Sequence, residues 1–377
     1  MPELVVMKFG GTSVRDDESR AAAVAQIRRH HESGKRIVVV VSAMGRKGEP
    51  YATDTLIDLL REIGEPVSAR ELDLVMSCGE TLSAAFFAHL LSKSKMPAIA
   101  FTGQQAGVVT DDAAGEAEIL GVDPMLIRRA LMQGKIAVVA GFQGADTDGE
   151  IRTLGRGGSD TSAVAIGAAL EASVVEIYSD VDGIASADPR RVTEAPFMEE
   201  IGAEQILAMA EEGSRVIHPR AVKASLITQT PILARNTFSD APGTLIHHRD
   251  IEGDLRPVAL AHRENQVLLE IRSKKDPRKV VPDLLEVGQF RFLLLNDVYL
   301  AERLATLRTN FGDYELEDGW ATASIILSHM EVSETPELDG AERMPIATGV
   351  WSYLVKEENL SSILDALFKR WLEVQPT

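Results

Sequence analysis

The sequence predicts an α/β protein whose largely parallel sheet is covered by helices on both faces, followed by a smaller α+β module. Short β-branched runs alternate with longer helical patterns up to residue 238 of the 377-residue chain. Several runs are apolar throughout, which is typical of strands buried on both faces. The alternation then breaks at a stretch rich in Pro, Gly and Asp, residues 239–257. A chain of this length also favours two domains over one core.

The part before the break supplies the strands of the parallel sheet. The predicted strands are Leu4–Lys8, Arg36–Ser42, Ile136–Ala140, Ser173–Ser179 and Pro231–Ala234. The predicted helices are Ser19–His31, Glu71–Leu91 and Ser159–Leu170. Asp16 and Asp17 are placed to cap the first helix.

Shorter elements follow the break. They are a strand Val267–Ile271, a helix near Lys279–Glu286, a strand Phe290–Leu295, a strand Val350–Val355 and a helix Leu360–Trp371. This pattern fits one small α+β module or two interleaved ones. The expected domains are residues 1–245 and residues 256–377, with 239–257 as the linker.

Composition excludes several classes of partner. The chain has 57 Asp and Glu against 39 Lys and Arg, a net charge of −18, so it lacks the basic surface that nucleic acids and anionic membranes attract. Any site for an anion must gather its positive groups locally. The single cysteine, Cys78, cannot form an intramolecular disulfide. No signal-peptide pattern or apolar run of membrane-spanning length is seen, so we expect a cytoplasmic protein.

The first candidate site is the sequence KFGG, residues 8–11, between a predicted strand and a predicted helix. Adjacent glycines let the backbone approach a phosphate closely, and Lys8 adds a positive charge. The spacing differs from the Walker A motif GxxxxGK[ST]. Taken alone, the motif is somewhat better explained as an ordinary strand-to-helix turn.

The second candidate site is GRGGSDT, residues 155–161, which opens a predicted helix. Arg156 can hold a carboxylate through two hydrogen bonds. Asp160 is placed to orient Lys8 or a substrate ammonium group. The alternative is a capping loop with Ser159 or Asp160 as the N-cap, but the density of glycine favours ligand binding.

Two further segments carry candidate residues. Ser179 and Asp180 follow a predicted strand, where α/β sheets bind ligands, although Asp-Gly and Asp-Pro pairs in this segment also form ordinary turns. Glu80 lies among small residues in a predicted helix, where it can accept a substrate ammonium, while most helix glutamates are merely solvated. Cys78 is expected to be a small buried side chain, and His218 a helix cap or turn residue.

Seven motifs occur in the order in which aspartate kinases carry them. They are KFGGTSV, VVVVSAMG, SCGE, GFQG, GRGGSDTSA, DVDGIASADPR and IHPRAV, spread over residues 1 to about 245. The chain therefore resembles the aspartate kinases of bacteria. The resemblance implies the amino-acid kinase fold, a three-layer α/β/α sandwich around an eight-stranded, mainly parallel sheet, with a C-terminal ACT-like (ferredoxin-like) module.

The resemblance also implies roles for individual residues. Lys8 and Asp160 would be the catalytic residues, with Glu80 on the substrate ammonium and Arg156 on its α-carboxylate. The substrate-binding set would be Ser42, Thr53, Glu80, Phe142, Arg156, Gly157, Gly158 and Ser159. The nucleotide-binding set would be Lys8, Phe9, Gly10, Gly11, Ser179, Asp180, Ala185, Ser186, Ala187, Asp188, Pro189, Arg190 and Arg215.

The implied reaction moves the γ-phosphoryl group of MgATP onto the side-chain carboxylate of L-aspartate. That carboxylate has a pKa near 4, so it is already an anionic nucleophile at neutral pH and needs no general base. Lys8, backbone N–H groups and Mg²⁺ would neutralise the moving charge. The product, β-aspartyl phosphate, begins lysine, threonine and methionine synthesis in bacteria.

The chain also departs from the aspartate kinase pattern. Ala185 replaces a common Tyr, Ser179 a Thr and Arg215 a Lys. Residues 256–377 look like a shortened, degraded pair of ACT domains, so we expect lost or altered feedback inhibition and a homodimer or higher oligomer formed through this region. Two alternatives stay open: a kinase for another amino acid or a carbamate, and a catalytically impaired regulatory paralogue that binds nucleotide.

Overall fold

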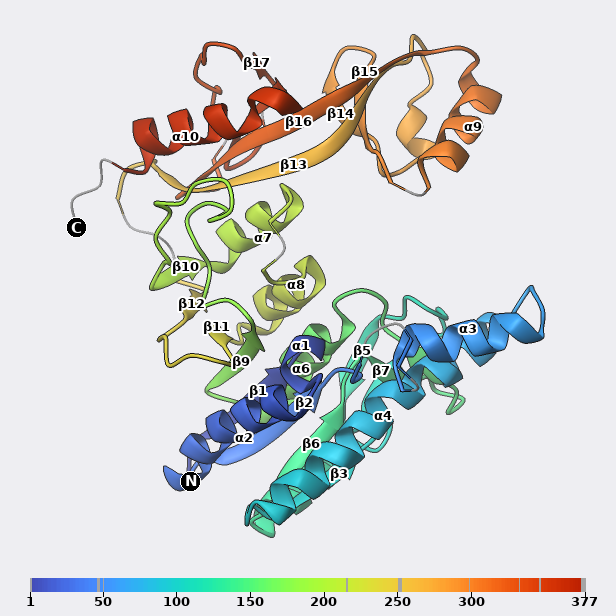
Figure 1. Ribbon diagram of the computed structural model, residues 1–377, viewed down its shortest axis with the longest axis vertical. Coiled ribbons are helices and arrows are strands. Elements are labelled where there is room, and N and C mark those ends of the chain that lie inside the picture. The colour runs from blue at the N-terminus through green and yellow to red at the C-terminus, as the bar shows by residue number, and fades with distance from the viewer. Residues whose placement is uncertain are drawn as a thin grey trace. The chain divides into compact units, whose positions relative to one another are not determined.

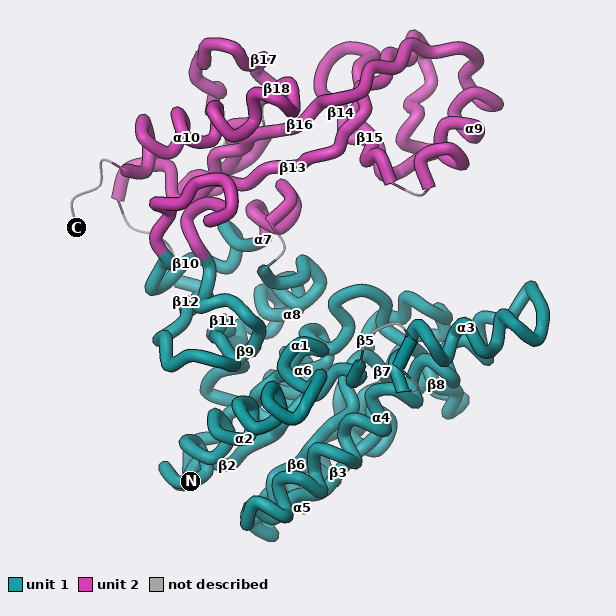
Figure 2. Tube along the Cα trace, viewed as in Figure 1, with its two compact units in different colours: residues 1–184, 197–206, 216–249 teal, residues 185–196, 207–215, 250–377 magenta. Residues whose placement is uncertain are grey.

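The computed structural model describes residues 2–45, 48–49, 51–214, 216–249, 253–297, 299–331, 333–345 and 347–373. The chain forms two compact units (Figure 2). The first unit comprises residues 1–184, 197–206 and 216–249, and the second comprises residues 185–196, 207–215 and 250–377. The predicted division at residues 245–256 therefore misplaces two inner segments. One reason is that Ala187, Val192 and Ala195 pack in an apolar cluster with strands and a helix of the second unit.

The first unit is built on an eight-stranded sheet (Figure 1). Its strands, in spatial order, are β10 (Glu200–Gly202), β12 (Thr244–His247), β11 (Ile232–Asn236), β9 (Val174–Ser179), β1 (Leu4–Phe9), β2 (Arg36–Val41), β6 (Ile136–Ala140) and β3 (Ala98–Phe101). Every neighbouring pair is parallel except β11 with β12. The predicted mainly parallel sheet is confirmed, but β12 lies within the stretch predicted to be a linker.

Helices cover both faces of this sheet, and β1 shows how the sequence directs them. Alternate residues of a strand point to opposite faces. Val5, Met7 and Phe9 pack in one apolar cluster with α2 (Asp17–Glu32) and α4 (Ala69–Lys93). Residues of the other parity, including Val6 and Lys8, face α6 (Gly158–Leu170). The predicted cap of α2 is confirmed, because the Asp16 side chain accepts a hydrogen bond from the Ser19 N–H at 2.8 Å.

Smaller elements complete the first unit. Its second sheet has the order β5-β4-β7-β8. The remaining elements are α1 (Gly11–Val14), α3 (Thr53–Ile63), β4 (Val108–Thr110), β5 (Ile119–Val122), α5 (Met125–Met132), β7 (Gln143–Ala145), β8 (Ile151–Thr153), α8 (Pro219–Thr228) and α7 (Ala203–Glu211), which runs into the second unit. Helix α4 is long and apolar enough to cross a membrane by composition, and the same composition suits a helix that packs on β3 and β6.

The second unit contains an antiparallel sheet of order β14-β15-β13-β16-β18-β17. Its elements are β13 (Pro257–Glu270), β14 (Leu285–Gly288), β15 (Arg291–Leu295), α9 (Leu300–Phe311), β16 (Glu315–Leu327), β17 (Glu342–Arg343), β18 (Val350–Lys356) and α10 (Leu360–Trp371), with 3-10 turns at Pro277–Lys279 and Glu357–Asn359. The helix predicted near Lys279–Glu286 is wrong. Pro282, which lacks an N–H to donate, stands in its interior.

Candidate functional site

An ion pair joins β1 to α6 at the centre of the first unit. Lys8 stands near the end of β1 and points toward α6, where Asp160 lies in the first turn. The Lys8 Nζ and Asp160 Oδ1 atoms are 2.5 Å apart, and the two side chains are only 11% and 13% exposed. The geometry expected of Asp160, that it orients Lys8, is therefore present.

Gly10, directly after β1, lies beside this lysine. A Cβ on Gly10 would come within 3.3 Å of Lys8 Nζ, so any larger residue would crowd the ammonium group. Phe9, in contrast, is buried and stacks on Tyr178 with ring centroids 4.7 Å apart. Its side chain belongs to the core, and only its backbone remains for the nucleotide contact that was predicted.

Two glycines with left-handed backbone conformations flank Arg156 in the glycine-rich loop. Gly155 and Gly157 have φ values of 68° and 72°, a region that favours glycine. A Cβ on Gly157 would lie 2.1 Å from the His218 ring. The N-cap of α6 is Gly157 and no side chain caps the helix, so the capping-loop alternative is wrong. Among the described residues Arg156 has no ion-pair partner, and its side chain is exposed.

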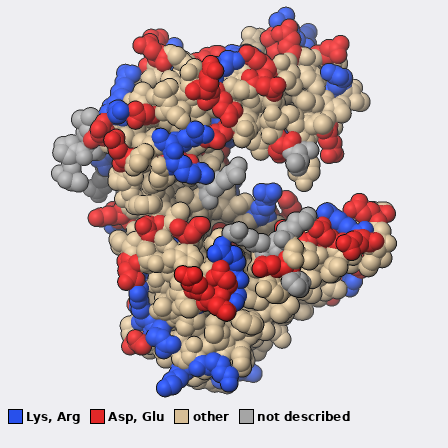
Figure 3. Space-filling model, in the orientation of Figure 1, with Lys and Arg blue, Asp and Glu red and all other residues tan. Residues whose placement is uncertain are grey.

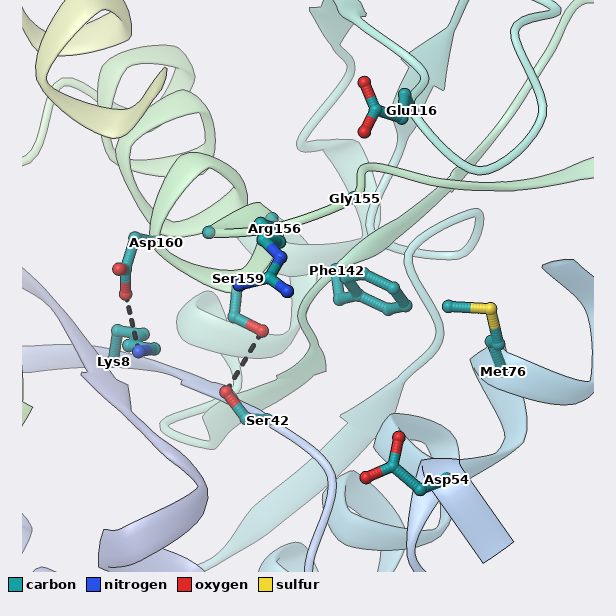
Figure 4. Close-up of a pocket in the computed structure, with 12 residues that line it drawn as sticks. Lys8, Ser42, Asp54, Met76, Glu116, Phe142, Gly155, Arg156, Ser159 and Asp160 are labelled. Atoms are coloured by element: carbon teal, nitrogen blue, oxygen red, sulfur yellow. Dashed lines mark hydrogen bonds and ion pairs between the residues drawn. The ribbon is translucent and has the colours of Figure 1, made fainter. Parts of the chain in front are cut away.

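The first unit contains a cavity of about 540 Å³ in front of this loop (Figure 4). Its lining residues are Lys8, Ser42, Asp54, Met76, Glu116, Phe142, Gly155, Arg156, Gly157, Gly158, Ser159 and Asp160. Ser42 donates a hydrogen bond to Ser159 at 3.1 Å across its floor. The sequence analysis missed Asp54, Met76 and Glu116. Asp54 could have been found from the sequence, because it directly follows the predicted substrate contact Thr53.

Glu80 is a buried member of the predicted substrate contacts. It is 5% exposed, and its Oε1 accepts the Ala43 N–H at 3.1 Å. Its Oε2 has no hydrogen-bond partner among the described residues. Burial raises the pKa of this carboxyl group to about 7.

Two of the predicted substrate contacts, Glu80 and Thr53, do not line the cavity. Thr53 Oγ1 would lie 3.0 Å from a Cβ on Gly79, so Gly79 lets α4 approach Thr53 closely. The prediction that Cys78 is buried is wrong, because its side chain is exposed on the outer face of α4.

The loop after β9 also lies near the end of β1. Strands β1 and β9 are parallel neighbours, with Phe9 opposite Tyr178, so Ser179 and Asp180 follow at the same edge as Gly10. Asp180 is exposed. The next acid, Asp182, accepts hydrogen bonds from Ser239 at 2.5 Å and Asn236 at 2.8 Å. These two bonds lower its pKa and hold the loop.

The other predicted nucleotide contacts lie in the second unit. Ala185, Ser186 and Ala187 are buried there. Asp188 pairs with the exposed Arg190 at 2.7 Å, which lowers the pKa of Asp188. Pro189 is also exposed. Arg215 lies outside the described residues.

His218 is a structural residue, as expected. It is the N-cap of α8, and its Nδ1 accepts the Arg220 N–H at 3.3 Å. Burial lowers the pKa of its ring. A neutral imidazole is the form that can accept this bond at Nδ1.

Comparison with known proteins identifies relatives of this chain. Residues 3–233 match the model of the "Amino acid kinase family". Aspartokinase 1 of Bacillus subtilis is 45% identical over 248 residues, which are 65% of this chain and 61% of that protein. The chain thus spans about three fifths of the length of this curated relative.

Solved structures agree on the fold. The aspartate kinase from Synechocystis is 28% identical, covering 99% of this chain and 70% of that one, with a TM-score of 0.59. E. coli aspartokinase III in complex with lysine and aspartate covers 98% of this chain and 100% of that one, with a TM-score of 0.78 and 23% identity. The fold, the motifs along the first unit and the family match agree, and the chain belongs to the amino acid kinase family.

Proposed function

We propose that the protein is an aspartate kinase, which transfers the γ-phosphoryl group of MgATP to the β-carboxylate of L-aspartate. The observation that carries this proposal is the cavity in which the buried Lys8–Asp160 pair lies beside Arg156, a cation without an ion-pair partner among the described residues. The named relatives support the choice of aspartate over another amino acid.

The two ends of the substrate would be held by opposite charges. Arg156 presents an exposed guanidinium that can bind the α-carboxylate through two hydrogen bonds. The unpartnered Oε2 of Glu80 is an acceptor for the α-ammonium group. Asp54 and Glu116, which line the cavity, add negative charge against a dianionic competitor that lacks an ammonium group.

The chemistry would depend on position and charge neutralisation. The aspartate carboxylate attacks as an anion, so no residue must remove a proton. Lys8, oriented by Asp160, would stabilise the charge on the transferred group. Among the described residues no cluster of three or more His, Cys, Asp or Glu could hold a metal. Mg²⁺ carried by the ATP phosphates would neutralise phosphate charge.

The nucleotide would lie at the edge where β1 and β9 end, on Gly10, Gly11, Ser179 and Asp180. Residues 185–190 and Arg215 remain proposed contacts. We further propose a cytoplasmic homo-oligomer formed through the second unit. On the face shown in Figure 3, acidic and basic side chains are interspersed, in keeping with small-molecule substrates as the partners.

The test is aspartate-dependent acyl phosphate formation with MgATP, trapped as the hydroxamate by hydroxylamine. Hydroxamate that requires both aspartate and ATP supports the proposal. ATP binding without hydroxamate would favour the regulatory paralogue, and hydroxamate with glutamate or another acid but not aspartate would change the substrate.

The same assay addresses regulation. We propose that feedback inhibition by lysine or threonine is lost or altered, because residues 256–377 resemble a shortened, degraded pair of ACT domains. A strong loss of activity at low lysine or threonine concentration would contradict this.

A further inference from the structure

Arg220 lies behind the cavity wall and takes no part in the steps above. It lies in the first turn of α8. Its guanidinium donates hydrogen bonds to the backbone carbonyls of Leu154 and, at 2.9 Å, Ala117, and it reaches the Glu116 carbonyl at 3.4 Å. Glu116 and the residues after Leu154 both line the cavity. One planar side chain therefore joins two loops of the site.

Asp73 joins the same two loops from α4. Its side chain is 0% exposed. Its oxygens accept hydrogen bonds from the Gly115 N–H at 3.0 and 3.1 Å and from the Thr153 hydroxyl at 2.5 Å. The loops also bond directly, because the Ala117 N–H donates to the Thr153 carbonyl at 2.9 Å.

The loop that carries Arg156 needs such external support. Glycine flanks Arg156 on both sides, with φ values of 68° and 72° at Gly155 and Gly157. Glycine has the widest range of backbone conformations and loses the most entropy when ordered. The Arg156 side chain itself is exposed and makes no ion pair within the described residues, so it does not anchor the loop.

We propose that Arg220 and Asp73 are positioning residues that place the Arg156 guanidinium in the cavity and thereby set the affinity for the α-carboxylate of the amino-acid substrate. The identity of that substrate rests on the proposed function, whereas the support of the two loops does not. The α-carboxylate keeps its charge during transfer, so its contact stabilises ground state and transition state alike. Loss of the contact therefore raises KM more than it lowers kcat.

The experiment compares Arg220→Met, Arg220→Lys and a matched control, Arg128→Met. Arg128 is an exposed arginine on α5 whose Nη2 donates to one backbone carbonyl, that of Ala169, at 2.8 Å. Arg220→Met should raise KM for aspartate about tenfold, with kcat and KM for ATP changed by about twofold or less. KM for aspartate in Arg220→Lys should lie between the wild-type and Arg220→Met values, because one ammonium group cannot donate to both loops as a planar guanidinium does.

Amide hydrogen exchange of the same proteins without substrate gives an independent readout. Arg220→Met and a second variant, Asp73→Asn, should speed exchange in residues 113–117 and 153–158, and Arg128→Met should not. Unchanged exchange there, or an unchanged KM for aspartate, would overturn the proposal, as would equal rises in KM for both substrates. If the wild-type chain shows no aspartate-dependent turnover, the proposed function fails, and exchange still decides whether Arg220 and Asp73 hold the loops.

Discussion

At the scale of single residues, two of the predicted site carboxyl groups, Asp160 and Glu80, have different surroundings. Asp160 lies 2.5 Å from the Lys8 ammonium group. Glu80 has only one backbone N–H as a partner and a buried, unpartnered oxygen. In the proposed function, Asp160 would orient Lys8 and Glu80 would accept the substrate ammonium group.

Removal of the Lys8 ammonium should affect phosphoryl transfer far more than stability. We expect Lys8→Met to lower kcat/KM for aspartate by about 10³-fold, because the charge that develops on the moving phosphoryl group loses its preorganised partner. The measurement is hydroxamate formation at saturating ATP. Lys35→Met, which breaks an ion pair with Glu3 of 3.0 Å at the opposite end of the strands, is the control. Near wild-type turnover in Lys8→Met would contradict the assigned role.

Glu80 should make aspartate binding depend on pH. Its folded pKa of about 7 lies above the usual value of 4.5, so ligand-free stability should fall as pH rises from about 4.5 to about 7 and then level off. The ammonium needs the ionised form, so KM for aspartate should rise as pH falls below 7. Glu80→Gln should raise KM about tenfold or more and remove this dependence.

The matched control for Glu80 lies on the same helix. Glu71→Gln removes an exposed carboxylate that pairs with Arg70 and should leave the pH profile of KM unchanged. A Glu80→Gln protein with the wild-type profile would show that another group titrates.

At the scale of elements, β9 carries a buried polar cluster on the face that packs against α2. Glu176 is 3% exposed and contacts His30 at 3.0 Å, the Tyr178 hydroxyl at 2.7 Å and Arg235 at 3.9 Å. Burial works to raise the pKa of Glu176, but these partners outweigh it and lower the pKa overall. The cluster ties β9 to α2 and β11, and the 179–184 loop follows directly after β9.

This cluster predicts acid sensitivity. Because the folded pKa of Glu176 is depressed, its contribution to stability is complete above the unfolded value near 4.5 and is lost as pH falls through the folded pKa. Glu176→Gln should lower the free energy of unfolding by about 2 kcal/mol at pH 7. The difference from wild type should shrink below pH 4.5. Denaturant unfolding at both pH values tests this, with the exposed Glu32→Gln as control.

At the scale of the whole molecule, the two units are interleaved along the chain. Residues 185–196 belong to the second unit although 197–206 return to the first. Within the second unit, Val192 and Ala195 pack in the same apolar cluster as Leu260, Leu364 and Phe368. The proposed nucleotide contacts at 185–190 are thus held by the unit that resembles a regulatory module.

Truncation after residue 249 should therefore not yield a well-packed first unit. A fragment of residues 1–249 keeps residues 185–196 but loses the apolar residues that cover them in the full chain. We expect it to bind the dye ANS and to unfold at a lower temperature than the full chain, because apolar surface becomes exposed. A fragment with the melting temperature of the full chain and no dye binding would contradict this.

The sequence by itself determined five of the eight strands of the large sheet and the motifs of the proposed site. Strands such as Arg36–Val41 can be predicted from the sequence, because an unbroken run of β-branched residues strongly favours a buried strand. The Arg156 loop was found for a local reason too, since its three glycines are costly without a ligand. The Lys8 loop was assigned from the resemblance to aspartate kinases. Helix α10 was predicted with its observed bounds from its amphipathic pattern.

Only the tertiary structure decided which of these residues meet. The Lys8–Asp160 distance, the place of Asp54 and Glu116 in the cavity and the two loops held by Arg220 all depend on segments far apart in the sequence. So do the burial of Phe9, the membership of β12 in the sheet and the division into two units. A local sequence pattern reflects the periodicity of one element. Burial and strand pairing depend on contacts between elements, so they are decided only when the chain has folded.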